Sequence, residues 1–182
     1  GDVYKRQVVR KAEEDEDKIW SYVQTVAAAA LDKFVAMREV EGAKMKADVA
    51  GRAQTILDCV AFVEERSPQT VREYNEKLAA RVHELLGDVT LDEGRLLQET
   101  AIFADKVAVA EETVRLRSHI AQLGKFLEAE EPIGRKMDFL VQEINREANT
   151  IGSKASDVAI AGKVIDIKAE VEKIREQIQN IE

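Results

Sequence analysis

The 182-residue chain is poor in cysteine, proline and aromatic residues, with one Cys, two Pro and 5% aromatic residues. The single cysteine, Cys59, excludes an internal disulfide framework, and its place in an apolar stripe predicts a small buried hydrophobic residue. The chain also lacks an apolar run near the roughly 18 residues of a membrane span. It has no evident signal peptide, zinc-type Cys/His cluster or phosphate-binding glycine loop. These absences predict a cytoplasmic protein that has no membrane partner.

The residues that are abundant favour long helices. Apolar residues make up 45% of the chain and charged residues 34%, which is more typical of a coiled-coil-like protein than of a sheet protein. The net charge is −8, so the overall charge does not support general binding to nucleic acid. Any such binding therefore requires a local basic surface.

Apolar residues recur three and four positions apart along most of the chain, and no segment shows convincing period-two alternation. We expect helices at about residues 13–66, 68–87, 90–130 and 134–152, followed by a last helix with a coiled-coil seam. The seam consists of Val164, Ile167, Val171, Ile174, Ile178 and Ile181. The predicted fold class is all-α, with long antiparallel helices and coiled-coil-like hairpins.

Local signals place the breaks between these helices. Ser67 and Pro68 have the pattern of an N-cap followed by proline at the first helical position, which predicts a helix restart. Thr90 and Glu93 have the spacing of a capping box, and the segment from there to about residue 130 is predicted to be one uninterrupted helix. Pro132 separates this helix from the next one.

The predicted helix at residues 134–152 has an unusual polar side, which continues to Ser153. It carries amides, hydroxyls and interleaved charges: Arg135, Gln142, Glu143, Asn145, Arg146, Glu147, Asn149, Thr150 and Ser153. A side that needed only solubility would use Lys and Glu, because these favour a helix more than Asn, Thr or Ser do. The pattern indicates directed hydrogen bonding to a partner helix or a ligand.

A second group of polar residues combines carboxylates with an imidazole. Asp105, Glu112 and His119 are each seven residues apart, which places them on one face of a continuous helix. Such groups hold a divalent ion or move protons at a phosphodiester. Seven helical residues rise roughly 10 Å, too far for one ion to reach all three. We therefore expect a second helix to close the site through Glu143 and Glu147.

The alternative interpretation of this group is a solvated helix face. Glu111 and Glu112 precede Arg115 by four and three residues, and ion pairs at these spacings are common on exposed helices. His83 lies on an ordinary amphipathic helix, and we expect it to be structural. The residues alone indicate a helical, oligomeric protein with one unusual polar face.

Longer sequence segments resemble a known family. The segment GRKMDFLVQEINREANTIGSKA (residues 134–155) and the ending EKIREQIQNIE closely resemble the C-terminal domain of the YicC/YloC-type bacterial endoribonucleases. Upstream segments match in the same order: VAMREVEG at 35–42, GRLLQETAIFADK at 94–106 and AEETVRLRSHI at 110–120. The resemblance covers roughly residues 8 to 182 and identifies the chain as a member of this family.

The resemblance implies a cytoplasmic bacterial enzyme that cuts RNA internally, depends on a divalent metal and forms ring-like homo-oligomers. DNA is not an expected substrate. Family members have an N-terminal domain with sheet content and a helical C-terminal domain. We expect residues 1–7 to be a non-native leader and 8–50 to be the end of the N-terminal domain. Residues 51–98 are then connecting helices and 99–182 the C-terminal domain, with the strand-containing start of the N-terminal domain missing from this chain.

The matching motifs supply three groups of candidate site residues, whose roles are hypotheses. The candidate catalytic residues are Glu112, His119, Glu143 and Glu147. The candidate RNA-binding residues are Arg115, Arg135, Asn145, Arg146, Asn149 and Lys154. The candidate ligands of a divalent cation, Mg or Mn, are Asp105, Glu111, Glu112 and Glu143.

The chain departs from the family pattern at three positions. Ala108 replaces a usual Asp, Thr113 a usual Leu and Ala159 a usual Glu. If the carboxylate at position 108 is a metal ligand in relatives, this chain is expected to bind metal more weakly or to be inactive.

Two other functions compete with an RNA-cutting site in these helices. In one, the helices serve oligomerisation and RNA binding, and the chemistry belongs to the missing N-terminal part. Coiled-coil seams and amide-rich faces favour this alternative. In the other, the protein is a non-enzymatic RNA-binding adaptor, which would bind RNA without metal-dependent cleavage.

Overall fold

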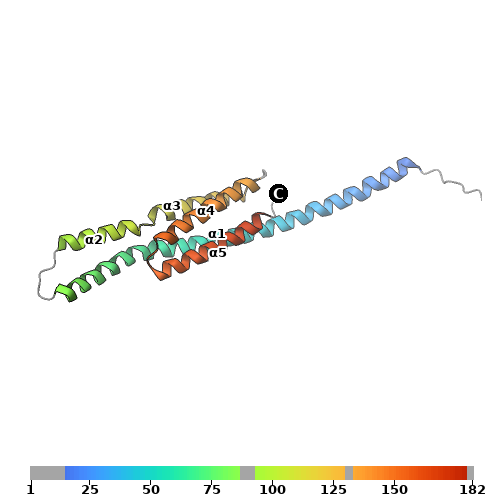
Figure 1. The fold of residues 1–182 in the computed structure, drawn as a ribbon. Helices are drawn as coiled ribbons and strands as arrows, with labels where there is room; N and C mark the ends of the chain where they lie inside the picture. Colours follow the sequence, from blue (N-terminus) through green and yellow to red (C-terminus); the bar gives the residue numbers. More distant parts are fainter. Residues whose placement is uncertain (1–14, 87–92, 130–132, 180–182) are drawn as a thin grey trace, which may run out of the picture. The chain divides into compact units, whose positions relative to one another are not determined.

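The computed structural model describes residues 15–86, 93–129 and 133–179. Within these ranges the chain forms helices and no strand, so the predicted all-α class is confirmed. The helices, in chain order, are α1 (Glu16–Leu86), α2 (Glu93–Lys106), α3 (Ala110–Phe126), α4 (Gly134–Lys154) and α5 (Val158–Ile178) (Figure 1). No described helix combines the length and the apolar character that a membrane crossing requires.

The chain divides into two compact units, Gly1–Lys44 and Met45–Glu182. In the first unit the described residues, 15–44, form the first part of α1 and no other element. Its apolar side chains are exposed, among them Trp20, Val26 and Phe34, which are 61%, 69% and 50% exposed. Exposed apolar surfaces of this extent are typical of contact sites for other polypeptide segments.

The second unit has a continuous apolar core to which α1, α3, α4 and α5 all contribute. α4 packs against both α3 and α5 (Figure 1). The predicted stripe of α4 is buried in full: Met137, Leu140, Ile144, Ala148 and Ile151. The apolar stripe of α5 from Val164 to Ile178 is buried as well, which confirms the predicted apolar patterns of α4 and α5. Cys59 is buried as expected, and burial raises the pKa of its thiol, which disfavours a reactive thiolate.

Two arginines attach α3 and α5 to α1. Arg117 of α3 donates two hydrogen bonds to the Glu64 carboxylate of α1, at 2.9 and 2.6 Å, and they lower the pKa of that carboxyl group. Arg66 of α1 donates to Asp157 at 2.8 Å and lowers its pKa too. Asp157 is also the N-cap of α5, because it accepts a hydrogen bond from the backbone N–H of Ile160. These contacts position α3 and α5, and α4 packs against both.

The predicted helix restart at Ser67–Pro68 is wrong. α1 continues through Pro68 without interruption. A proline inside a helix removes one N–H donor and crowds the preceding turn, but neighbouring contacts can offset that cost. Arg66 and Glu73, which lie on either side of Pro68, are joined by two hydrogen bonds of 2.6 and 3.0 Å. These bonds bridge the turns on either side of Pro68.

The prediction of one uninterrupted helix from residue 90 to 130 is also wrong. α2 ends at Lys106 and α3 begins at Ala110. Val107 and Val109, in the connection, are only 6% and 4% exposed. On a continuous helix two residues separated by one position point in nearly opposite directions. The break therefore allows both valines to be buried.

Several expectations concern residues outside the described ranges. They are the leader at 1–7, the capping residue Thr90, the break at Pro132 and the last seam residue, Ile181. The proposed domain boundaries near residues 50 and 98 remain predictions.

Candidate functional site

A line of polar side chains follows the contact between α3 and α4, and we call it the seam. Its members are Glu112, Arg115 and His119 of α3, and Glu143, Glu147 and Lys154 of α4. Glu112 contacts Lys154, Arg115 contacts Glu147, and His119 lies near both Glu143 and Glu147. Early residues of α3 thus meet late residues of α4, as antiparallel packing requires.

The seam arises because the core-facing stripes of the two helices are flanked by polar positions. Leu116, Ile120 and Leu123 bury one side of α3 in the core. Glu147 follows the buried Ile144 by three residues on α4, and it is itself only 4% exposed. A carboxylate this deeply buried requires a positively charged or hydrogen-bonding partner.

Beyond the Arg115–Glu147 contact, the seam contains a cluster of His119, Glu143 and Glu147. One ligand-type atom of each residue lies within 4.8 Å of the others. His119 and Glu143 are half-buried, and Glu147 is buried. Arg115 approaches the cluster, with its Nη1 atom 3.8 Å from Oε1 of Glu147. That distance allows an ionic attraction but is too long for a hydrogen bond.

The cluster has the composition of a cation site. Two carboxylates so close together repel each other. Arg115, near Glu147, and Arg146, which pairs with Glu143 at 3.4 Å, offset this only in part because their side chains are 49% and 69% exposed. One imidazole nitrogen and two carboxylate oxygens form a mixed donor set, which suits manganese or zinc better than magnesium, since magnesium prefers oxygen ligands alone. The three residues fit a divalent ion, and a modest contraction of the side chains would bring them to coordination distance.

Glu112 and Lys154 form a separate contact at one end of the seam. The Lys154 ammonium donates to Oε1 of Glu112 at 2.6 Å, and the Glu112 side chain is 6% exposed. The second carboxylate oxygen of Glu112 is buried and accepts no hydrogen bond from the described residues. This ion pair between Glu112 and Lys154 links the start of α3 to the end of α4.

The remaining predicted ligands lie apart from the cluster. Asp105 is exposed on α2, beyond the break that separates α2 from α3. Glu111 is exposed and pairs with Arg115. Of the predicted ligand set Asp105, Glu111, Glu112 and Glu143, only Glu143 belongs to the three-residue cluster found among the described residues.

The other predicted polar residues of α4 form a second surface, which we call the outer strip. Arg135, Gln142, Arg146, Asn149 and Ser153 are spaced 7, 4, 3 and 4 residues apart, so they share one face of the helix. The last four, together with Asn145 and Thr150, line a shallow hollow. Thr150 and Ser153 donate their hydroxyls to the helix's own carbonyls, at 3.1 and 2.8 Å. Gln142 donates to Asp138 at 2.8 Å, and the largely exposed Arg146 pairs with Glu143 at 3.4 Å. Arg135, Asn145 and Asn149, together with the exposed part of Arg146, are therefore the groups of this strip best placed to contact a partner.

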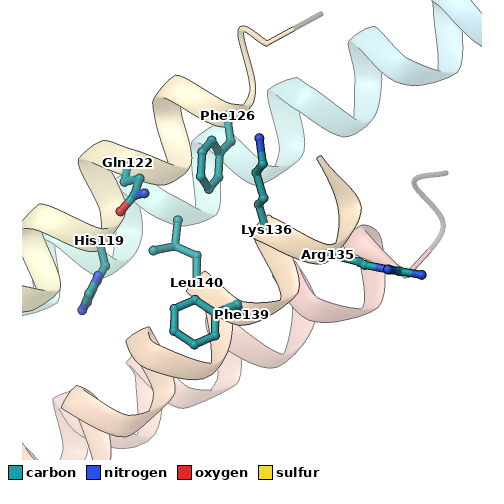
Figure 2. Close-up of a pocket in the computed structure, with 7 residues that line it drawn as sticks. All are labelled: His119, Gln122, Phe126, Arg135, Lys136, Phe139 and Leu140. Atoms are coloured by element: carbon teal, nitrogen blue, oxygen red, sulfur yellow. The ribbon is translucent and has the colours of Figure 1, made fainter. Parts of the chain in front are cut away.

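A hollow that the sequence pattern does not predict lies at the other end of the seam. His119, Gln122 and Phe126 of α3 and Arg135, Lys136, Phe139 and Leu140 of α4 line it (Figure 2). Phe139 is 64% exposed and lies outside the apolar stripe of its own helix. An aromatic residue on the polar side of a helical pattern was the signal that could have revealed this hollow.

Fold and site together define an all-α protein that carries a histidine–carboxylate cluster beside a strip of cationic and amide side chains. The chain belongs to the endoribonuclease YicC-like family, as its resemblance predicted. Residues 63–182 match the C-terminal part of that family and residues 2–47 match its N-terminal region.

Two curated relatives carry the name "Probable endoribonuclease YicC". The protein of Clostridioides difficile is 49% identical over 175 residues, which cover 96% of this chain and 60% of the relative. The protein of Haemophilus influenzae is 34% identical over 175 residues, with the same coverage of 96% and 60%. The chain thus spans 60% of the length of each relative.

Proposed function

We propose that this chain contains the RNA-cutting site of an endoribonuclease, and that the cluster of His119, Glu143 and Glu147 binds the divalent cation needed for cleavage. The proposed setting is RNA turnover in the bacterial cytoplasm. The name of the relatives supports RNA as substrate. The main support for the proposal is that three ligand-type atoms from two helices lie within 4.8 Å of one another.

Each group of residues has a distinct task in this proposal. His119, Glu143 and Glu147 would hold the ion. A divalent ion, when bound, stabilises negative charge on a phosphate and favours deprotonation of a bound water. Arg115 orients the Glu147 carboxylate through its ionic contact. The arginines of the outer strip bind phosphates, for which the planar guanidinium is suited.

The amides of the outer strip recognise the RNA strand. Asn145 and Asn149 offer donors and acceptors that match RNA 2′-hydroxyls and the edges of unpaired bases. They lie along one side of α4, next to Arg146. An RNA strand that followed this strip would pass along the helix that also supplies Glu143 and Glu147 to the cluster.

The test is cleavage of a labelled structured RNA by this chain with manganese, with magnesium and with neither. Glu143→Gln should lower the cleavage rate by at least about 100-fold, because it replaces a charged ligand by a neutral, weaker one of the same size. Glu172→Gln is the matched control, since Glu172 is an exposed carboxylate of α5 that pairs with Arg175. Equal rates for both variants would contradict the proposal.

An assembly function is the second candidate, and the exposed apolar side chains of residues 19–40 favour it. In this alternative, the seam closes contacts between subunits of a homo-oligomer, and the chemistry belongs to another part of the protein. Light scattering decides between the two on the double variant Glu143→Gln, Glu147→Gln. Loss of the oligomer supports the assembly function, whereas loss of cleavage at unchanged mass supports the active site.

A further inference from the structure

The hollow beside the cluster, between α3 and α4, has the size and composition of a small-ligand site. Its volume is about 470 Å³, within the range of roughly 300–1,000 Å³ that is typical of such sites. Phe126 and Phe139 supply aromatic surface, Leu140 lies between the two helices, and Gln122 supplies an amide (Figure 2). An aromatic face combined with an amide is the usual means by which proteins bind an unpaired nucleobase.

We propose that this hollow binds one unpaired base of the RNA strand whose phosphate lies at the His119–Glu143–Glu147 cluster. The inference rests on the proposed function, because it assigns a substrate subsite to the same site. His119 connects the two features, since it belongs to the cluster and also lines the hollow. A nucleotide bound here would therefore place its base and its phosphate in adjacent places along one seam.

Phe139 is the main stacking surface in this inference. It is 64% exposed, so its ring is available to a base without any rearrangement of the core. The Gln122 amide is exposed on α3 and can donate to or accept from a base edge. Arg135 extends away from the other labelled side chains (Figure 2). It lies on the same face of α4 as Arg146, where it can bind the backbone of the same strand.

The composition of the hollow favours RNA over a second copy of the protein. Lysine is depleted in protein–protein interfaces, whereas Lys136 borders the hollow. Positive charge beside an aromatic ring matches a nucleotide, which combines an anionic backbone with a flat base. A base held in this way must be unpaired, so the hollow selects single-stranded segments.

The test measures binding of a short fluorescein-labelled oligoadenylate to this chain in EDTA, so that metal-dependent cleavage plays no part. Phe139→Ala should weaken binding about tenfold, and Phe139→Trp should stay within about twofold of the parent. Phe62→Ala is the matched control, because Phe62 is an exposed aromatic residue of α1 outside the hollow, 37% exposed. Binding of a duplex of the same length should be unchanged in all variants.

A second arm replaces one nucleotide of the oligonucleotide by an abasic site at successive positions. At one position the abasic site should lower the binding affinity as much as Phe139→Ala does. Combining that abasic site with Phe139→Ala should cause no further loss of affinity. Equal binding by Phe139→Ala and Phe62→Ala would overturn the inference. A change in mass on Phe139→Ala, measured by light scattering, would also overturn it and assign the hollow to a subunit contact.

The same variants separate this inference from the proposed function. If Glu143→Gln loses cleavage while Phe139→Ala binds RNA normally, the base subsite fails and the proposed function stands. If Glu143→Gln cleaves normally while Phe139→Ala binds weakly, the subsite stands and the metal cluster fails.

Discussion

Removal of the Lys154 ammonium should destabilise the protein more than removal of the whole Glu112–Lys154 pair. The Glu112 side chain is 6% exposed, and Lys154→Met would leave neither of its carboxylate oxygens bound by a cation. Breaking a fully buried ion pair costs roughly 3–5 kcal/mol. Since the Lys154 side chain is 32% exposed, water screens part of that cost, and we expect about 1–3 kcal/mol.

The double variant Glu112→Leu, Lys154→Met is the comparison that tests this reasoning. It removes both charges and replaces them with apolar groups, so its stability should lie within about 1 kcal/mol of the parent. Urea denaturation monitored by circular dichroism measures the unfolding free energy of both variants at equal protein concentration. A double variant as unstable as the single one, or an unchanged single variant, would refute the argument. The single variant should also keep the salt dependence of RNA binding, because Lys154 is occupied by Glu112.

Three further predictions follow from contacts elsewhere. Gly124→Ala should raise the unfolding free energy by roughly 0.5–1 kcal/mol, because an added Cβ on α3 meets no other atom within 4 Å; a lowered urea midpoint would contradict this. The unfolding free energy should fall as the pH drops below about 4, because Arg117 lowers the pKa of Glu64 and the stabilisation is lost when that carboxylate is protonated. Arg117→Met should flatten this dependence in urea titrations. Arg135→Gln and Arg146→Gln should each reduce the salt slope of single-stranded RNA binding by roughly 0.7, as measured by anisotropy, and unchanged slopes would remove them from the RNA surface.

Helical periodicity predicted the elements whose burial pattern is strong. It correctly predicted the buried stripe of α4 from Met137 to Ile151 and that of α5 from Val164 to Ile178. Local signals failed where tertiary contacts overrode them. Pro68 lies within α1, and Val107 and Val109 are buried at a break that has no glycine or proline to mark it.

The sequence predicted which polar residues are unusual better than it predicted how they are grouped. Spacing along one helix joined Asp105 to Glu112 and His119, but the break after α2 separates Asp105 from the other two. The closeness of His119 to Glu143 depends on the antiparallel register of α3 and α4, which spacing within one helix does not contain. Phe139 was missed because periodicity analysis concentrates on the buried stripe.

Calorimetric titration of manganese into this chain shows whether the His119–Glu143–Glu147 cluster binds a divalent ion. We expect one manganese site per chain in the parent protein, and a loss of affinity of at least about tenfold in both His119→Ala and Glu143→Gln. The control variant Glu172→Gln should bind manganese as the parent does. Equal manganese affinity in the parent and both cluster variants would rule out this cation site, since His119 and Glu143 would then have no part in binding the ion.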